Sequence, residues 1–171
     1  MKVLYADDHW ITRSAAKHLI DRLEPGSELL EAADFRQALE IASGNPDLDL
    51  ILLDLLMPGM KRFQGLRAMR ECLPQVPVVV MSAIEDRDEI LRCIEAGAMG
   101  YIPKSAQADE IESALQTVLS GGVAFPRLSE HTVRVHVSAI VKRLNLDSRT
   151  QAAISAAAQV RAMEEAEAAN F

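Results

Sequence analysis

The stretch Leu50-Ile51-Leu52-Leu53-Asp54-Leu55-Leu56-Met57-Pro58-Gly59 decides the fold of this chain. Its first four residues are apolar, which is typical of a strand covered on both faces, and the turn at Pro58-Gly59 ends the segment. A helix is predicted near Gln64–Cys72, and a second apolar run follows at Pro77–Met81. A strand, a helix and another strand in this order form the repeating unit of a parallel sheet.

The same unit extends in both directions along the chain. The predicted strands are Val3–Ala6, Leu29–Ala33, Leu50–Leu53, Pro77–Met81 and Gly100–Pro103. The predicted helices are Ile11–Leu23, Phe35–Ala42, Gln64–Cys72, Asp88–Ala96 and Ala106–Ser120, the last capped by Ser105. This alternation predicts an α/β fold, a doubly wound five-stranded parallel sheet with right-handed crossovers, followed by a small all-α segment.

Chemically active side chains stand where the predicted strands end, at Asp7-Asp8, Asp54, Ser82 and Lys104. Ligands bind at the carboxyl ends of the strands in such a sheet. Taken singly, these residues have ordinary explanations as a helix cap, a turn residue or a solvated lysine. Their occurrence at four of five strand ends favours a common site.

Three carboxylates held together repel one another, so the predicted site requires a cation. An all-oxygen set of ligands suits Mg²⁺, which commonly joins carboxylates to a phosphoryl oxygen. A carboxylate beside that ion can attack phosphorus and become an aspartyl phosphate. A hydroxyl and an ammonium nearby can then bind the phosphoryl oxygens.

Composition sets wider limits. The chain has 171 residues, of which 49% are hydrophobic and 25% charged, so a disordered or coiled-coil protein is excluded. No apolar run reaches the roughly 18 residues of a membrane span, and Asp7-Asp8 comes too early for a signal peptide, so we expect a cytoplasmic protein without membrane contact. Cys72 and Cys93 are expected to be buried, reduced thiols.

Four motifs resemble the receiver domain of two-component response regulators, which has a flavodoxin-like fold. They are Leu4-Tyr5-Ala6-Asp7-Asp8-His9, Leu52-Leu53-Asp54-Leu55-Leu56-Met57-Pro58-Gly59-Met60, Val80-Met81-Ser82-Ala83 and Gly100-Tyr101-Ile102-Pro103-Lys104. The resemblance covers about residues 1–122. It implies that a histidine kinase phosphorylates the chain in a Mg²⁺-dependent reaction, and that the chain is not otherwise an enzyme.

The resemblance also assigns roles to individual residues. Asp54 is similar to the phosphoacceptor, Ser82 to the switch hydroxyl, Lys104 to the lysine that pairs with the phosphoryl group, and Tyr101 to the aromatic residue that rotates inward. Without the resemblance, Tyr101 would be a half-buried strand residue. The implied Mg²⁺ ligands are Asp8, Asp54 and the backbone carbonyl of Leu56. Asp7 is implied to support these ligands without binding the ion directly.

Two departures from the family pattern affect the expected behaviour. Arg62 stands where relatives usually have glycine, which implies a different backbone course or a more basic loop. Leu56 and Ile84 stand where some relatives have polar residues that orient the hydrolytic water. Apolar side chains at these two positions predict a long-lived phosphoryl group.

The region after residue 126 differs in charge from the rest of the chain. Residues 1–126 have 12 Lys and Arg against 20 Asp and Glu, whereas residues 127–171 have 6 against 5. Residues 128–153 resemble the C-terminal half of the LuxR-type helix-turn-helix found in the NarL/FixJ branch of response regulators. By that resemblance Ser129–Leu144 is a recognition helix, and its candidate DNA-contacting residues are Arg134, Val135, His131, Ser138 and Lys142.

The expected organisation is a receiver domain at residues 1–122, a junction at 123–127 and a partial output segment at 128–171. Relatives place a linker and two helices before the recognition helix, whereas here residues 122–127 lead directly into it. Either these helices are absent from the protein, or the sequence as read lacks residues at this junction. An intact mass near 18.7 kDa would mean that the helices are absent.

The leading hypothesis is therefore a regulator whose phosphorylation on Asp54 controls DNA binding, acting as a homodimer in at least one state. The alternative is a receiver that acts through protein contacts and whose output segment does not bind DNA. An aspartyl-phosphate hydrolase is a third possibility, but Leu55-Leu56-Met57 offers no general acid beside the nucleophile.

Overall fold

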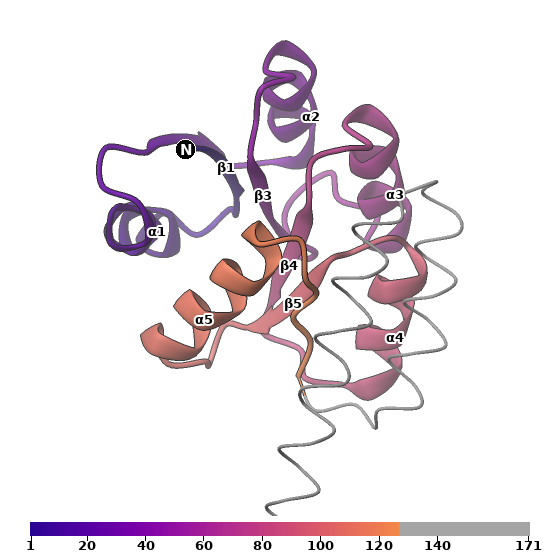
Figure 1. Cartoon of the computed structure of the whole chain (residues 1–171). Helices are drawn as coiled ribbons and strands as arrows, with labels where there is room; N and C mark the ends of the chain where they lie inside the picture. Colours follow the sequence, from indigo (N-terminus) through magenta and orange to yellow (C-terminus); the bar gives the residue numbers. More distant parts are fainter. Residues whose placement is uncertain (127–171) are drawn as a thin grey trace, which may run out of the picture.

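The computed structural model describes residues 1–126, which form a five-stranded parallel sheet with helices on both faces (Figure 1). The strands are β1 (Lys2–Ala6), β2 (Glu28–Ala32), β3 (Leu50–Asp54), β4 (Val78–Ser82) and β5 (Gly100–Pro103). The helices are α1 (Trp10–Leu23), α2 (Phe35–Gly44), α3 (Phe63–Cys72), α4 (Arg87–Glu95) and α5 (Ala108–Leu119). The predicted doubly wound fold is confirmed.

Strand β3 lies in the middle of the sheet, whose order is β2-β1-β3-β4-β5. Its five residues are all buried, as the uninterrupted apolar run predicts. Ile51 and Leu53 belong to the core shared with α2, α3 and α4, whereas Leu50 and Leu52 belong to the core shared with α1 and α5. Both sides of the sheet are therefore covered, with α1 and α5 on one face and the other helices opposite (Figure 1).

The strand order places the carboxyl ends of β1 and β3 at the topological switch point of the sheet. From β1 the chain moves to one side to form β2, and then crosses to the other side for β3. The loops that follow β1 and β3 diverge at such a point and leave room for a ligand between them. The sequence places Asp7-Asp8 and Asp54 at these two ends.

Helix α5 begins later than predicted. The expected cap was Ser105, but the helix starts at Ala108, where the backbone N–H of Gln107 donates to Glu110 Oε2 at 2.9 Å. Residues 103–106 form a turn in which the N–H of Ala106 donates to the carbonyl of Pro103. Ser105 is therefore outside the helix, and its hydroxyl donates to Glu85 Oε1 at 2.6 Å.

The two cysteines differ in environment. Cys93 is wholly buried, and burial, helped by the charge of Glu89, raises the pKa of its thiol to about 12. Cys72 is only partly buried, so the expectation of two buried thiols is wrong for this residue. Among residues 1–126, no helix has both the length and the apolar character of a membrane span.

Candidate functional site

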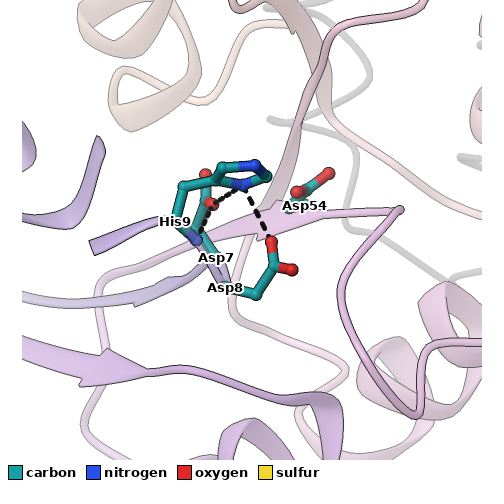
Figure 2. Close-up of side chains that lie close together, drawn as sticks. All are labelled: Asp7, Asp8, His9 and Asp54. Atoms are coloured by element: carbon teal, nitrogen blue, oxygen red, sulfur yellow. Dashed lines mark hydrogen bonds and ion pairs between the residues drawn. The ribbon is translucent and has the colours of Figure 1, made fainter. Parts of the chain in front are cut away.

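The acidic residues predicted from the sequence meet at the carboxyl edge of the sheet. Asp7, Asp8 and His9 come from the loop after β1, and Asp54 is the last residue of β3 (Figure 2). Potential metal-binding atoms of these four residues all lie within 4.8 Å of one another. Residues separated by more than 40 positions in the chain thus form one site.

Asp54 is held at both carboxylate oxygens. Its side chain is 1% exposed. The backbone N–H of Leu56 donates to Oδ1 at 3.0 Å, and Lys104 Nζ donates to Oδ2 at 2.8 Å. These two contacts fix the position of a nearly buried carboxylate at the end of β3.

Lys104 joins Asp54 to Asp7, since its Nζ also lies 2.8 Å from Asp7 Oδ2. Burial by itself lowers the pKa of Lys104, but hydrogen bonds and charge from Asp54 and Asp7 outweigh that effect and raise the pKa above its usual value. The lysine is therefore held as a cation between two buried carboxylates.

Asp7 has fixed partners on both carboxylate oxygens. Oδ1 accepts from the backbone N–H of His9 at 2.9 Å, and Oδ2 accepts from the Tyr5 hydroxyl at 3.0 Å as well as from Lys104. Burial alone raises the pKa of Asp7, but these hydrogen bonds and the charge of Lys104 outweigh it and lower the pKa. Asp7 is therefore an ionised residue whose lone pairs are largely occupied.

Asp8 is the more accessible carboxylate, since 34% of its side chain is exposed, and its Oδ1 lies 2.8 Å from His9 Nδ1. Within residues 1–126, the charges of Asp7, Asp8 and Asp54 exceed the single charge of Lys104 placed among them. A divalent cation bound by Asp8 and Asp54 would balance this excess, and carboxylate oxygens are the ligands that a hard cation prefers. The residues present therefore fit such an ion.

Ser82 and Tyr101 form a second group beside the carboxylates. Ser82 is wholly buried, and its Oγ accepts from the backbone N–H of Ile84 at 3.2 Å. The Tyr101 hydroxyl donates to the backbone carbonyl of Ile84. Burial raises the pKa of Tyr101 to about 12, although a hydrogen bond with Ser82 acts in the opposite direction. Tyr101 is 2% exposed, so it lies inward rather than half-buried.

Two supporting residues, Tyr5 and Arg13, were not predicted from the sequence. Tyr5 is 2% exposed, and its hydroxyl donates to Asp7 Oδ2. Burial, and to a smaller extent the charge of Asp7, raises the pKa of the Tyr5 hydroxyl, so it stays protonated and can donate. Arg13 Nη1 donates to the Asp7 carbonyl at 2.6 Å and anchors the loop after β1. The spacing of Tyr5 and Asp7 was the available signal, because side chains two positions apart in extended backbone point to the same side, and Asp7 directly follows β1.

Within residues 1–126, Arg62 is the one residue other than glycine with a positive φ. It has φ 42° and ψ −116°, so this arginine adopts a left-handed conformation that favours glycine. Its Nη1 lies 3.2 Å from Glu89 Oε2 on α4. Glu89 is 8% exposed and Arg62 is half exposed, so the pair connects the loop before α3 to a nearly buried carboxylate.

We expect Arg62→Gly to be more stable than Arg62→Ala by about 1 kcal/mol or more. Both variants lose the ion pair with Glu89, but only glycine adopts the positive φ at this position without strain. The measurement is urea unfolding of both variants. Arg36, paired with Glu40 on α2, provides the control. There glycine should be less stable than alanine by about 0.5–1 kcal/mol. The same order at Arg62 would contradict the assignment of strain.

The candidate DNA-contacting residues lie outside the described residues. They are His131, Arg134, Val135, Ser138 and Lys142. Their predicted roles therefore rest on the sequence resemblance.

Two protein families match the chain. The response regulator receiver domain matches residues 3–116, and the luxR family of bacterial regulatory proteins matches residues 127–156. The glycerol metabolism activator of Pseudomonas putida is 34% identical over 208 aligned positions, covering 91% of this chain and 94% of that protein. Because the alignment has more positions than this chain's 171 residues, it contains internal gaps in this chain.

Several solved structures are also similar to this chain. A LuxR family DNA-binding response regulator from Silicibacter pomeroyi shares 31% identity with a TM-score of 0.65, covering 75% of this chain and 98% of its own. A Borrelia burgdorferi complex of CheX and CheY with BeF₃ and Mg²⁺ shares 25% identity with a TM-score of 0.62, covering 70% of this chain and 87% of its own. The chain therefore belongs to the two-component response regulators, in which a receiver domain is followed by a LuxR-type DNA-binding segment that controls transcription.

Proposed function

We propose that a histidine kinase phosphorylates Asp54 in a Mg²⁺-dependent reaction, and that phosphorylation controls DNA binding by the output segment. The observation that carries this proposal is the position of Asp54, nearly buried, bonded to Lys104 and close to Asp8. The test is the intact mass of the full chain after incubation with a small phosphodonor. One phosphoryl group should be added with Mg²⁺ present and none with EDTA.

In the proposed reaction a carboxylate oxygen of Asp54 attacks the phosphorus atom of the donor. A new P–O bond forms, and the bond from phosphorus to the donor breaks, with its electron pair leaving on the donor group. Lys104 Nζ, now 2.8 Å from Asp54 Oδ2, would bind the phosphoryl oxygens. Donation from the Leu56 N–H holds Oδ1 in place during attack.

The proposed metal ligands are Asp8, Asp54 and the Leu56 carbonyl. Asp7 is proposed to support these ligands without binding the ion directly. The accessibility of Asp8 and the occupied oxygens of Asp7 support this division of roles. The Mg²⁺ in the similar Borrelia complex supports the choice of ion. When bound, Mg²⁺ would supply positive charge to the phosphoryl oxygens.

We expect Mg²⁺ to change the fluorescence of Trp10, the single tryptophan of the chain, which is 69% exposed and two residues from Asp8. Asp8→Asn should weaken the apparent Mg²⁺ affinity by about 10-fold or more. The measurement is a fluorescence titration. Asp21→Asn changes an exposed carboxylate on α1 and should titrate like the parent. Equal affinity in the two variants would contradict the metal assignment.

Switching is proposed to involve Ser82 and Tyr101. For Ser82 Oγ to bind a phosphoryl group, it must leave the N–H of Ile84. Tyr101 contacts the carbonyl of the same residue, so movement of the loop after β4 reaches both side chains. Phosphorylation would then shift the balance between two arrangements of this loop.

Exposed apolar residues near the site support docking of a protein donor. Trp10 and Ile11 are 69% and 64% exposed at the start of α1, and Leu56 is 47% exposed after β3. Exposed apolar side chains beside a reactive group are typical of a surface that another protein covers. We propose that the kinase binds here.

We expect the phosphoryl group on Asp54 to last for minutes or longer, because the side chains of Leu56 and Ile84 offer no polar group to hydrolytic water. Leu56→Asn should shorten its lifetime by about 10-fold or more. The measurement is the decay of phosphorylated intact mass. Ile11→Asn places the same amide on another exposed position and serves as the control. A half-life of seconds in the parent would contradict this prediction.

The alternative function is signalling by protein contact without DNA binding. The start of the luxR family match at residue 127, directly after the receiver domain, favours it, because a helix-turn-helix without its first helices would be incomplete. The intact mass and a DNA-binding measurement on the same preparation separate the two functions. We further propose a cytoplasmic protein that dimerises in at least one state and has no enzymatic activity beyond its own phosphorylation.

A further inference from the structure

Residues 123–125, which follow α5, lie along the free edge of β5. The Tyr101 N–H donates to the Ala124 carbonyl at 2.7 Å, and the Ala124 N–H donates to the Met99 carbonyl at 3.1 Å. Gly100 and Ala124 form a parallel bridge. In Figure 1 the chain after α5 runs beside β5. We call residues 123–125 the edge segment.

The edge segment is also packed into the core. Ala124 is 5% exposed and Phe125 is 9% exposed. Phe125 belongs to the same buried cluster as Tyr101 and the α4 residues Ile90, Cys93 and Ile94. A Cβ added to Gly100 would lie 3.0 Å from the Ala124 carbonyl oxygen, so the close approach depends on glycine.

We infer that the edge segment transmits the state of the phosphorylation site to the output segment. Tyr101 contacts Ile84 through its hydroxyl and Ala124 through its backbone N–H. The match to the luxR family begins at residue 127, directly after the edge segment. A shift of Tyr101 therefore reaches the output segment through one hydrogen bond and a few residues of chain. This inference rests on the proposed phosphorylation of Asp54.

A purely structural role would also explain the pairing, because edge strands are commonly covered by another segment. The two explanations differ in one consequence. If the pairing differs between the two states of the site, then weakening the edge segment must change ligand affinity at Asp54, since coupling between sites is reciprocal. If the edge segment only covers the edge of β5, weakening it would leave the ligand affinity at Asp54 unchanged.

The test uses the full chain with Mg²⁺, with and without beryllium fluoride as the phosphoryl analogue. We expect the analogue to change hydrogen exchange of the Ala124 amide by about 10-fold. The Leu30 amide of β2, at the opposite edge of the sheet, should not respond. We expect Gly100→Ala to change the affinity for the analogue by about 5-fold or more, measured through Trp10 fluorescence.

Gly44→Ala is the matched control, because a Cβ there meets nothing within 4 Å. The added Cβ of Gly100→Ala also approaches the methyl groups of Val79 at 3.2 and 3.3 Å. Phe125→Ala therefore serves as a second variant that leaves β4 and β5 unchanged, with Leu73→Ala as its control, since Leu73 is also 9% exposed.

The outcomes separate the two proposals. Binding of the analogue by the parent, with unchanged exchange at Ala124 and parental affinity in Gly100→Ala and Phe125→Ala, would overturn the inference and leave the proposed function intact. Failure of the parent to bind the analogue would overturn the proposed function, and this inference with it. Altered exchange at Ala124 together with altered affinity in the edge-segment variants, but not in the controls, would support the inference.

Discussion

Asp54→Asn is expected to reduce Mg²⁺-dependent phosphorylation of the chain by a small phosphodonor by more than about 100-fold. The amide has nearly the same size and retains a carbonyl oxygen for Lys104 or Leu56, but it lacks the anionic oxygen that attacks phosphorus. The measurement is the fraction of phosphorylated intact mass as a function of time.

Asp47→Asn makes the same chemical change at an exposed carboxylate that contacts Lys2. This control should be phosphorylated at the parental rate. Unfolding in urea should show that Asp54→Asn remains folded, since the change removes a negative charge from a cluster of three carboxylates. Persistent Mg²⁺-dependent phosphorylation of folded Asp54→Asn would refute the phosphoacceptor assignment.

Lys104→Met is expected to lower the free energy of unfolding by about 2–3 kcal/mol near pH 7 in EDTA. Methionine keeps most of the apolar stem but removes the charge between two carboxylates that are 0% and 1% exposed. Since 19% of the lysine side chain remains exposed, the expected loss lies below the full cost of breaking a buried ion pair.

Lys2→Met is a matched control. Lys2 is also 19% exposed, but its partners Glu28 and Asp47 are 60% and 69% exposed. Solvent screens that interaction, so the expected loss is less than about 1 kcal/mol. Equal losses in the two variants, measured by urea unfolding, would show that Lys104 does not stabilise the buried carboxylates.

The two lysine variants should also differ in their dependence on pH. In the parent, folding lowers the pKa of Asp7 from its ordinary value of 3.8. The resulting stabilisation is fully present above pH 3.8 and is lost as pH falls through the folded-state pKa. Folding raises the pKa of Lys104 above its ordinary value of 10.5. The resulting stabilisation is fully present below pH 10.5 and is lost as pH rises through the folded-state pKa.

Without Lys104, the clustered carboxylates hold protons more tightly when folded than when unfolded. Lys104→Met should therefore gain stability as pH falls from about 7 to about 5 in EDTA, and Mg²⁺ should restore part of the loss at pH 7. Lys2→Met should follow the parental profile. A parental profile in Lys104→Met would contradict this account of the charge balance.

Most of the fold was predictable because its signals are local. The apolar run at 50–53 is long enough for a buried strand, and the turns at Pro58-Gly59 and Gly121-Gly122 separate the elements. The predicted start of α5 was wrong because serine is a common helix cap. In the structure the helix is capped at Gln107 instead, where the Glu110 side chain accepts from the Gln107 backbone N–H. Ser105 instead bonds to Glu85 on another loop.

The alternation of strands and helices by itself determined that Asp7, Asp8, Asp54, Ser82 and Lys104 share one edge, because parallel strands present their carboxyl ends on the same side. Only the tertiary structure decided that Asp7 and Asp54 are buried while Asp8 is more accessible. It also decided that Arg62 pairs with Glu89 at a positive φ, and that residues 123–125 lie along β5. Those features depend on neighbours distant in sequence. Their burial and pairing are fixed by through-space packing, which a local pattern of residues does not contain.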